Sequence, residues 1–131
     1  GVITAEEFAV FQNAGYMGLY GGMTVDDIHR KKNLEVGQKI LDYMGSTELI
    51  ANLFRISQTE EKLRKDRISN SDSASAVHYK VGSEVREAIE KIGGTMPEDL
   101  PTPEKSIAQL EKEQLQRLKQ QALDGQLMLD E

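Results

Sequence analysis

The 131-residue chain is 38% hydrophobic and 29% charged, proportions typical of a single globular domain with one modest core. It has no cysteine, which excludes disulfides and thiolate metal sites, and no apolar run approaches the ~20 residues that a membrane-spanning helix needs. The net charge of −6 argues against a surface that binds nucleic acid over its whole extent. We therefore expect a cytoplasmic protein without membrane contact, with association with the nucleoid as an open alternative.

A helix is predicted near the start of the chain. Thr4 and Glu7 have the spacing of a capping box ahead of an apolar stripe, which predicts a helix over about 5–14. Gly15 is expected to end this helix. The glycine-rich residues 15–22 favour a loop or a broken helical turn, because glycine readily adopts positive φ.

Two short helices are expected next. Thr24 can cap a helix over about 25–32, whose first turn is acidic and therefore favoured by the helix dipole. A further helix is predicted over about 35–44, and Gly45 is expected to end it.

The longest helix is expected over about 47–66, where apolar residues recur every three or four positions. Residues 69–75 are predicted to form a polar linker or a helix cap, followed by a second long helix over about 74–92. The two long helices are expected to share a core, formed by Leu49, Leu53, Phe54, Ile56, Val81, Val85 and Ile89.

The last predicted helix, over about 103–123, follows a proline-rich connector and has a long apolar stripe. In a domain this small the stripe has few obvious partners, so we expect the helix to protrude and to make a self-association or partner contact. The residues of this self-association or partner contact would be Leu110, Leu115 and Leu118. The alternative is that the helix folds back onto its own core. These features predict an all-α, compact bundle of five to six helices over 1–101, with an amphipathic helix and tail over 102–131.

No pattern in the chain predicts catalysis. Asp26 and His29 share one face of a predicted helix, but a zinc site needs three or four ligands and no third is indicated. The glycines of 15–22 lack the lysine and serine or threonine of a phosphate-binding loop. We therefore predict no catalytic, metal or cofactor site, and a protein that is not an enzyme.

Two basic clusters lie at the ends of predicted helices. They are either solvated helix ends or a joint patch that contacts phosphates, and a charge run is more often a solvated face. The candidate nucleic-acid-binding residues are Arg30, Lys31, Lys32, Lys62, Arg64, Lys65 and Arg67.

Three long segments carry a family resemblance: FQNAGYMGLYGG at 11–22, QKILDYMGSTELIANLFR at 38–55 and GGTMPEDLPTP at 93–103. Together they resemble the C-terminal domain of the bacterial DNA-damage-inducible protein D (DinD) family. The resemblance implies a protein associated with the SOS response. Members of this family are tied to modulation of the RecA recombinase and its filaments on single-stranded DNA.

The leading hypothesis is an interaction domain that modulates RecA or its filaments, so the expected partners are RecA and single-stranded DNA. From Glu98 onward the chain has eight acidic and four basic residues, an excess suited to a basic partner face. The alternatives are a nucleic-acid-binding module that uses the basic clusters, and a structural module that forms a homodimer through the last helix. A metal-dependent nuclease is the least favoured alternative.

Overall fold

The computed structural model describes residues 3–104 and 106–129, apart from the side chains of residues 107 and 126–129. This described part of the chain is entirely helical, with five α-helices, two short 3-10 helices and no strand. The elements are α1 Ala5–Leu19, α2 Val25–Lys31, η1 Ile40–Asp42, α3 Ser46–Lys65, α4 Ser71–Ile92, η2 Pro97–Asp99 and α5 Ile107–Leu129. The prediction of an all-α bundle of five to six helices is confirmed.

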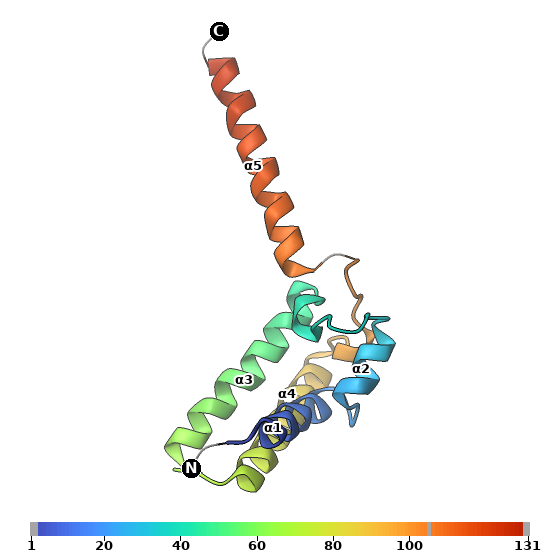
Figure 1. Cartoon of the computed structure of the whole chain (residues 1–131), viewed down its shortest axis with the longest axis vertical. Helices are drawn as coiled ribbons and strands as arrows, with labels where there is room; N and C mark the ends of the chain where they lie inside the picture. Colours follow the sequence, from blue (N-terminus) through green and yellow to red (C-terminus); the bar gives the residue numbers. More distant parts are fainter. Residues whose placement is uncertain (1–2, 105, 130–131) are drawn as a thin grey trace.

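Four helices form the body of the molecule, and α5 extends away from it (Figure 1). Within the body, α1 packs mainly against α4, and α3 packs against α4 and, less extensively, against α1. In the described residues, no helix combines the length and apolar character that crossing a membrane requires.

Both N-terminal helices begin at the predicted caps. The Thr4 hydroxyl accepts a hydrogen bond from the Glu7 amide at 3.0 Å, and the Glu7 carboxylate accepts one from the Thr4 amide. Thr24 and Asp27 repeat this arrangement at the start of α2. Each capping box satisfies two amide groups that the first helical turn leaves without a partner.

The prediction that α1 ends at Gly15 is wrong, because the glycines of this helix serve packing. A Cβ on Gly82 of α4 would lie 2.8 Å from the Gly15 carbonyl oxygen and 2.9 Å from the Leu19 amide nitrogen. A Cβ on Gly18 would collide with the Tyr79 carbonyl oxygen. The glycines therefore let the backbones of α1 and α4 approach closely, and the helix continues through them.

The helix predicted over 35–44 is also wrong. Gly37 adopts a φ of 89°, a conformation that a right-handed helix excludes, and only the short turn η1 forms after it. Gly45 does not end a helix, since it is the N-cap residue of α3. The chain between α2 and α3 is therefore mostly irregular.

α4 begins three residues earlier than predicted. The Asn70 side chain accepts a hydrogen bond from the Ser73 amide at 2.8 Å and caps the helix at Ser71. Of the two alternatives for 69–75, polar linker and helix cap, the helix cap is found at Asn70, and residues 71–75 already belong to α4.

The core lies between α1 and α4, and α2 and the segment from η1 to α3 add further buried side chains to it. Val81 and Val85 are buried in it, as predicted. Leu49, Ile56 and Ile89 are partly buried. The buried hydrophobic residues are Tyr16, Leu19, Tyr20, Ile28, Ile40, Met44, Val81 and Val85.

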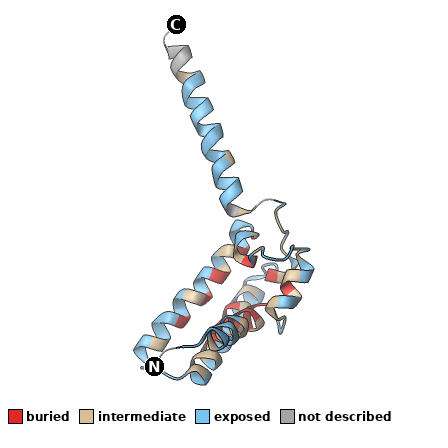
Figure 2. Cartoon of the chain, in the orientation of Figure 1, coloured by how far each residue is buried: buried red, intermediate tan, exposed pale blue. Residues whose placement is uncertain are grey.

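The prediction that Leu53 and Phe54 are core residues is wrong. Their exposed fractions are 51% and 53%, because α3 turns a different face towards α1 and α4. The buried positions of this helix form one narrow stripe (Figure 2). That stripe is polar, and it consists of Glu48, Asn52, Arg55 and Thr59.

The three leucines predicted to make a contact lie on α5, away from the body. Leu110, Leu115 and Leu118 are 38%, 53% and 54% exposed. The exposed surface of α5 continues along its described length (Figure 2). The division of the chain into two parts at residue 102 stays a prediction.

Candidate functional site

The buried face of α3 determines what the helix presents to solvent. Its four polar side chains recur at spacings of four, three and four residues, which places them on one face. Each is at most 2% exposed. Buried polar groups are stable only when they are hydrogen-bonded, so this face requires a connected network.

One end of the network is a buried ion pair. Lys32, at the end of α2, donates to the Glu48 carboxylate at 2.8 Å, and the two side chains are 5% and 0% exposed. The Tyr20 hydroxyl donates to the other oxygen of the same carboxylate. Lys32 also donates to the Tyr43 carbonyl at 3.2 Å and to the Thr102 hydroxyl at 3.3 Å. The ion pair thus joins α1, α2, α3 and the connector that leads to α5.

The network continues along α3 towards α4. The Asn52 amide donates to the Tyr20 hydroxyl at 3.0 Å, and the Arg55 Nε donates to the Asn52 side-chain oxygen at 3.0 Å. The Arg55 guanidinium lies 4.3 Å from the centre of the Tyr16 ring and donates to His78 Nε2 at 2.7 Å. A cation–π contact and two hydrogen bonds therefore hold a buried cation for which the described residues provide no carboxylate partner.

His78 must be neutral in this arrangement. Arginine only donates, so Nε2 accepts and the Nδ1–H donates to the Phe11 carbonyl at 2.9 Å. Burial and, secondarily, the neighbouring Arg55 charge lower the pKa of His78 to about 4. Burial, reinforced by the hydrogen bond to Glu48, raises the pKa of Tyr20. Both groups therefore stay uncharged at neutral pH.

Because the inner face of α3 is polar, its apolar side chains line an exposed groove against α4, which we call the α3–α4 groove. Its apolar half has a volume of about 350 Å³. The residues lining this half are Thr47, Ile50, Ala51, Phe54, Val85, Ala88, Ile89, Ile92, Gly94, Thr95, Pro97 and Leu100.

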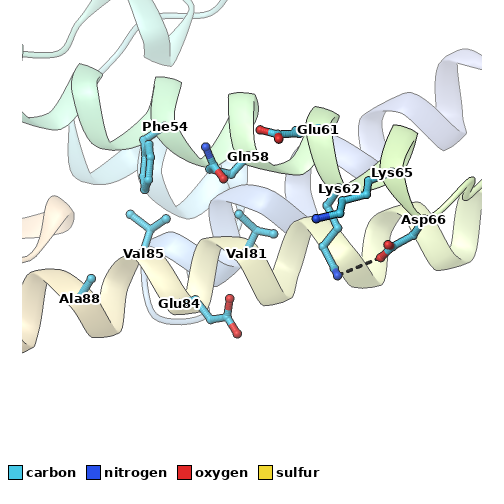
Figure 3. A pocket seen from close by; sticks show the side chains of 10 residues that line it. All are labelled: Phe54, Gln58, Glu61, Lys62, Lys65, Asp66, Val81, Glu84, Val85 and Ala88. Carbon is cyan, nitrogen blue, oxygen red and sulfur yellow. Dashed lines mark hydrogen bonds and ion pairs between the residues drawn. The ribbon is translucent and has the colours of Figure 1, made fainter.

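A charged half continues the groove towards the C-terminal end of α3, with a volume of about 440 Å³ (Figure 3). The two halves share Phe54, Val85 and Ala88, so they form one groove. The remaining residues of the charged half are Gln58, Glu61, Lys62, Lys65, Asp66, Val81 and Glu84.

The first predicted basic cluster is engaged within the fold. Arg30 pairs with Asp27 at 2.6 Å, and Lys31 lies 3.6 Å from the Asp99 carboxylate. Lys32 is buried in the ion pair with Glu48, so it does not present its charge to a phosphate.

The second predicted basic cluster lies at the other end of α3. Lys62 pairs with Asp66 at 2.9 Å, whereas Arg64, Lys65 and Arg67 are exposed and make no ion pair within the described residues. A helix rises 1.5 Å per residue, so Glu48, which holds the first cluster, is roughly 20 Å from Lys62. The two clusters therefore do not form one joint patch.

The histidines are both hydrogen-bonded to the backbone. His29 Nε2 lies 2.9 Å from the Gln38 carbonyl oxygen, and His78 contacts the Phe11 carbonyl. Among the described residues, no three histidine, aspartate or glutamate side chains are grouped closely enough to hold a metal ion.

Sequence reasoning missed the α3–α4 groove because it assigned the apolar residues of α3 to the core. The signal that could have found the groove is the 4–3–4 spacing of Glu48, Asn52, Arg55 and Thr59, which marks one polar face of α3. A polar face usually lies towards solvent, so by itself this spacing favoured an exposed polar face and a buried apolar face, the reverse of what the structure shows.

The body is all-helical, and its apolar groove half between two long helices has a form that can receive an amphipathic helix. Residues 1–110 match the family model of the DinD C-terminal domain, so the chain belongs to this family and the resemblance is confirmed. The chain is 59% identical over 111 residues to DNA damage-inducible protein D of Escherichia coli strain K12. This alignment covers 85% of the chain and 40% of that relative, so the chain spans less than half of the relative's length. No solved structure matches the chain.

Proposed function

We propose that this chain is a non-enzymatic interaction domain of the bacterial DNA-damage response, acting in the cytoplasm, and that it engages RecA filaments on single-stranded DNA. The observation that carries the proposal is the α3–α4 groove, which lies within the part of the chain that matches the DinD family. Its proposed role is to compete for contacts within the filament and so to modulate RecA in the SOS response.

The groove supports a protein ligand for two reasons. An apolar groove between two helices has the shape that receives an amphipathic helix, with apolar anchors at spacings of three and four residues. The exposed Phe54 ring lies where the two halves meet, and large aromatic side chains often provide most of the binding energy at such contacts.

The first test replaces Phe54 by serine. Because this side chain is half exposed, Phe54→Ser is expected to cost only about 1 kcal/mol of unfolding free energy. Binding to RecA filaments assembled on single-stranded DNA is expected to weaken at least about tenfold, which corresponds to about 1.4 kcal/mol. Biolayer interferometry on immobilised filaments measures the affinity, and urea denaturation measures the stability.

The matched control is Val36→Ser, which removes an exposed apolar side chain in the loop before η1, outside the groove. It is expected to leave the affinity for the filaments unchanged. Equal binding by wild type, Phe54→Ser and Val36→Ser would contradict the proposed role of the groove. Absence of binding by all three chains would contradict the choice of RecA as partner.

The second candidate function, binding of single-stranded DNA, is favoured by Arg64, Lys65 and Arg67 at the end of α3, which are exposed and have no ion-pair partner in the described part of the chain. If they contact phosphates, reversing their charges is expected to weaken binding and to flatten its salt dependence by about one logarithmic unit per lost contact. Fluorescence anisotropy against salt concentration measures this slope. Arg30→Glu, at the other cluster, is the control, and a wild-type chain that does not bind at low salt would exclude this function for the domain.

A further inference from the structure

We propose that a separate pocket, between α1 and α3, binds a small carboxylic acid with a flat apolar body, and that Arg55 is the counter-ion of its carboxylate. We call this site the α1–α3 pocket, and its volume is about 140 Å³. It shares no lining residue with either half of the α3–α4 groove. The inference therefore goes beyond the proposed function and does not depend on RecA.

The inner end of the α1–α3 pocket carries a buried positive charge. Arg55 and His78 both line the pocket, and each is 2% exposed. The guanidinium has five N–H donors in a planar fork. One donates to the Asn52 side-chain oxygen and another to His78 Nε2, both within the network on α3. These two bonds leave N–H groups of the fork for a carboxylate, the anion whose geometry matches it.

A buried arginine is costly when no anion accompanies it. Arg55 makes no ion pair with any residue that the structure describes. Arginine stays charged in proteins, and a charge removed from water is compensated best by an opposite charge. Burial lowers the pKa of Arg55, which reflects this cost. The Tyr16 ring and the neutral His78 compensate only part of the charge, so a carboxylate in the pocket is attracted by a poorly solvated cation.

The fold holds this cation in place before a ligand arrives. A Cβ on Gly15 of α1 would lie 2.2 Å from His78 Nε2 and 2.7 Å from Arg55 Nη1, so only glycine leaves room for the pair. The other ring nitrogen of His78 is held by the Phe11 carbonyl at 2.9 Å. A side chain that is already ordered loses little further freedom on binding, which favours affinity for a small ligand.

The walls of the pocket match the apolar part of the ligand. Phe8, Phe11, Leu41 and Ile56 line it. The rings of Phe8 and Phe11 are stacked, with centroids 6.5 Å apart, so a flat ring can pack against them. A cavity of about 150 Å³ in a protein core binds one benzene molecule. The α1–α3 pocket therefore suits a body of that size whose carboxylate points towards Arg55.

Glu60 is the acidic residue of the lining, and it does not cancel the attraction. It is exposed, whereas Arg55 is buried. Charges interact more weakly where water and salt screen them, so the buried cation dominates inside the pocket. Glu60→Gln is expected to strengthen carboxylate binding by no more than about threefold.

Two sources carry this ligand chemistry: a free aromatic acid and the C-terminal phenylalanine of another protein chain. Benzoate is the probe for the first, and its uncharged isostere benzamide is the control. A tripeptide that ends in phenylalanine is the probe for the second, with the same peptide amidated at its C-terminus as the control. Titrations of the wild-type chain followed by ¹H–¹⁵N NMR measure the affinities and show which amides respond.

The charged form of each probe that binds is expected to bind at least about tenfold more tightly than its uncharged control, with shifts at residues that line the pocket. Binding of benzoate alone would assign the pocket to a free acid, and binding of the peptide would assign it to a chain terminus; either result supports the proposal. Binding of neither probe would overturn it, and so would equal affinity for the charged and uncharged forms.

Two variants test the assigned residues. Arg55→Gln removes the charge and keeps a hydrogen-bond donor, so the preference for the charged probe is expected to disappear. Phe8→Ala shortens a half-exposed wall residue and is expected to weaken binding at least about fivefold, and it decides the question if Arg55→Gln does not fold. Val10→Ala is the matched control, an exposed apolar residue of α1 outside the pocket. Binding that Arg55→Gln and Phe8→Ala leave unchanged would overturn the assignment.

Discussion

Glu48→Ala is expected to lower the unfolding free energy by about 3–5 kcal/mol, a large part of the stability of a domain of this size. The substitution leaves the Lys32 ammonium buried without a counter-ion and removes the acceptor of the Tyr20 hydroxyl. Losing one partner of a buried pair costs far more than the pair contributes, because the remaining charge stays desolvated. Urea denaturation followed by circular dichroism measures the change.

Glu61→Ala is the matched control, since it removes a carboxylate from the exposed surface of the same helix. It is expected to change the unfolding free energy by less than about 0.5 kcal/mol. Replacing both members of the pair, as in Glu48→Leu with Lys32→Met, is expected to recover much of the lost stability, because no unpaired charge remains. A Glu48→Ala chain as stable as Glu61→Ala would show that the ion pair is solvated.

Stability is expected to fall by about 3 kcal/mol as the pH decreases from 6.5 to 4, through the titration of His78 alone. The folded protein holds the pKa of this imidazole at about 4, whereas the unfolded chain has the ordinary value of 6.5. Between these values the unfolded chain binds the proton and the folded chain does not. The contribution is therefore fully present above pH 6.5 and is lost as the pH falls towards 4.

The His78→Gln variant isolates this contribution, because glutamine has no titrating group and its side-chain oxygen can accept from Arg55. The carboxylates of the chain titrate in both proteins, so the difference between their stability–pH curves reports His78. Urea denaturation at pH 6.5 and pH 4 measures it. Parallel curves for the two proteins would show that His78 is already protonated, or solvated, in the folded state.

The groove and the network are two consequences of one feature of α3. Glu48, Asn52 and Arg55 find their protein partners on α1, α4 and at the end of α2, so this face is buried and Ile50 and Phe54 lie on the outside. The domain thus uses a polar contact to hold α3 and keeps apolar surface available for a partner. Changes in the network are expected to alter the shape of the groove as well as the stability of the fold.

Local signals in the sequence determined the helices that begin with caps. Thr4, Thr24 and the polar residues before α4 carry their own hydrogen-bonding groups, so the start of each helix follows from neighbouring residues. The family was likewise evident from contiguous segments. Glycine was less informative, because Gly15 allows a close helix contact whereas Gly37 adopts a left-handed turn, and the residue type alone does not distinguish these two uses.

The sequence by itself thus determined the helical class, most helix positions, the family and the amphipathic character of the last helix, since these depend on local periodicity and on long matching segments. Only the tertiary structure decided which face of α3 is buried. Arg55 and Asn52 become acceptable core residues because Tyr16 and Tyr20 of α1 and His78 of α4 meet them from distant parts of the chain. A polar side chain is costly to bury alone and stable when its partners are in place, and periodicity carries no information about those partners.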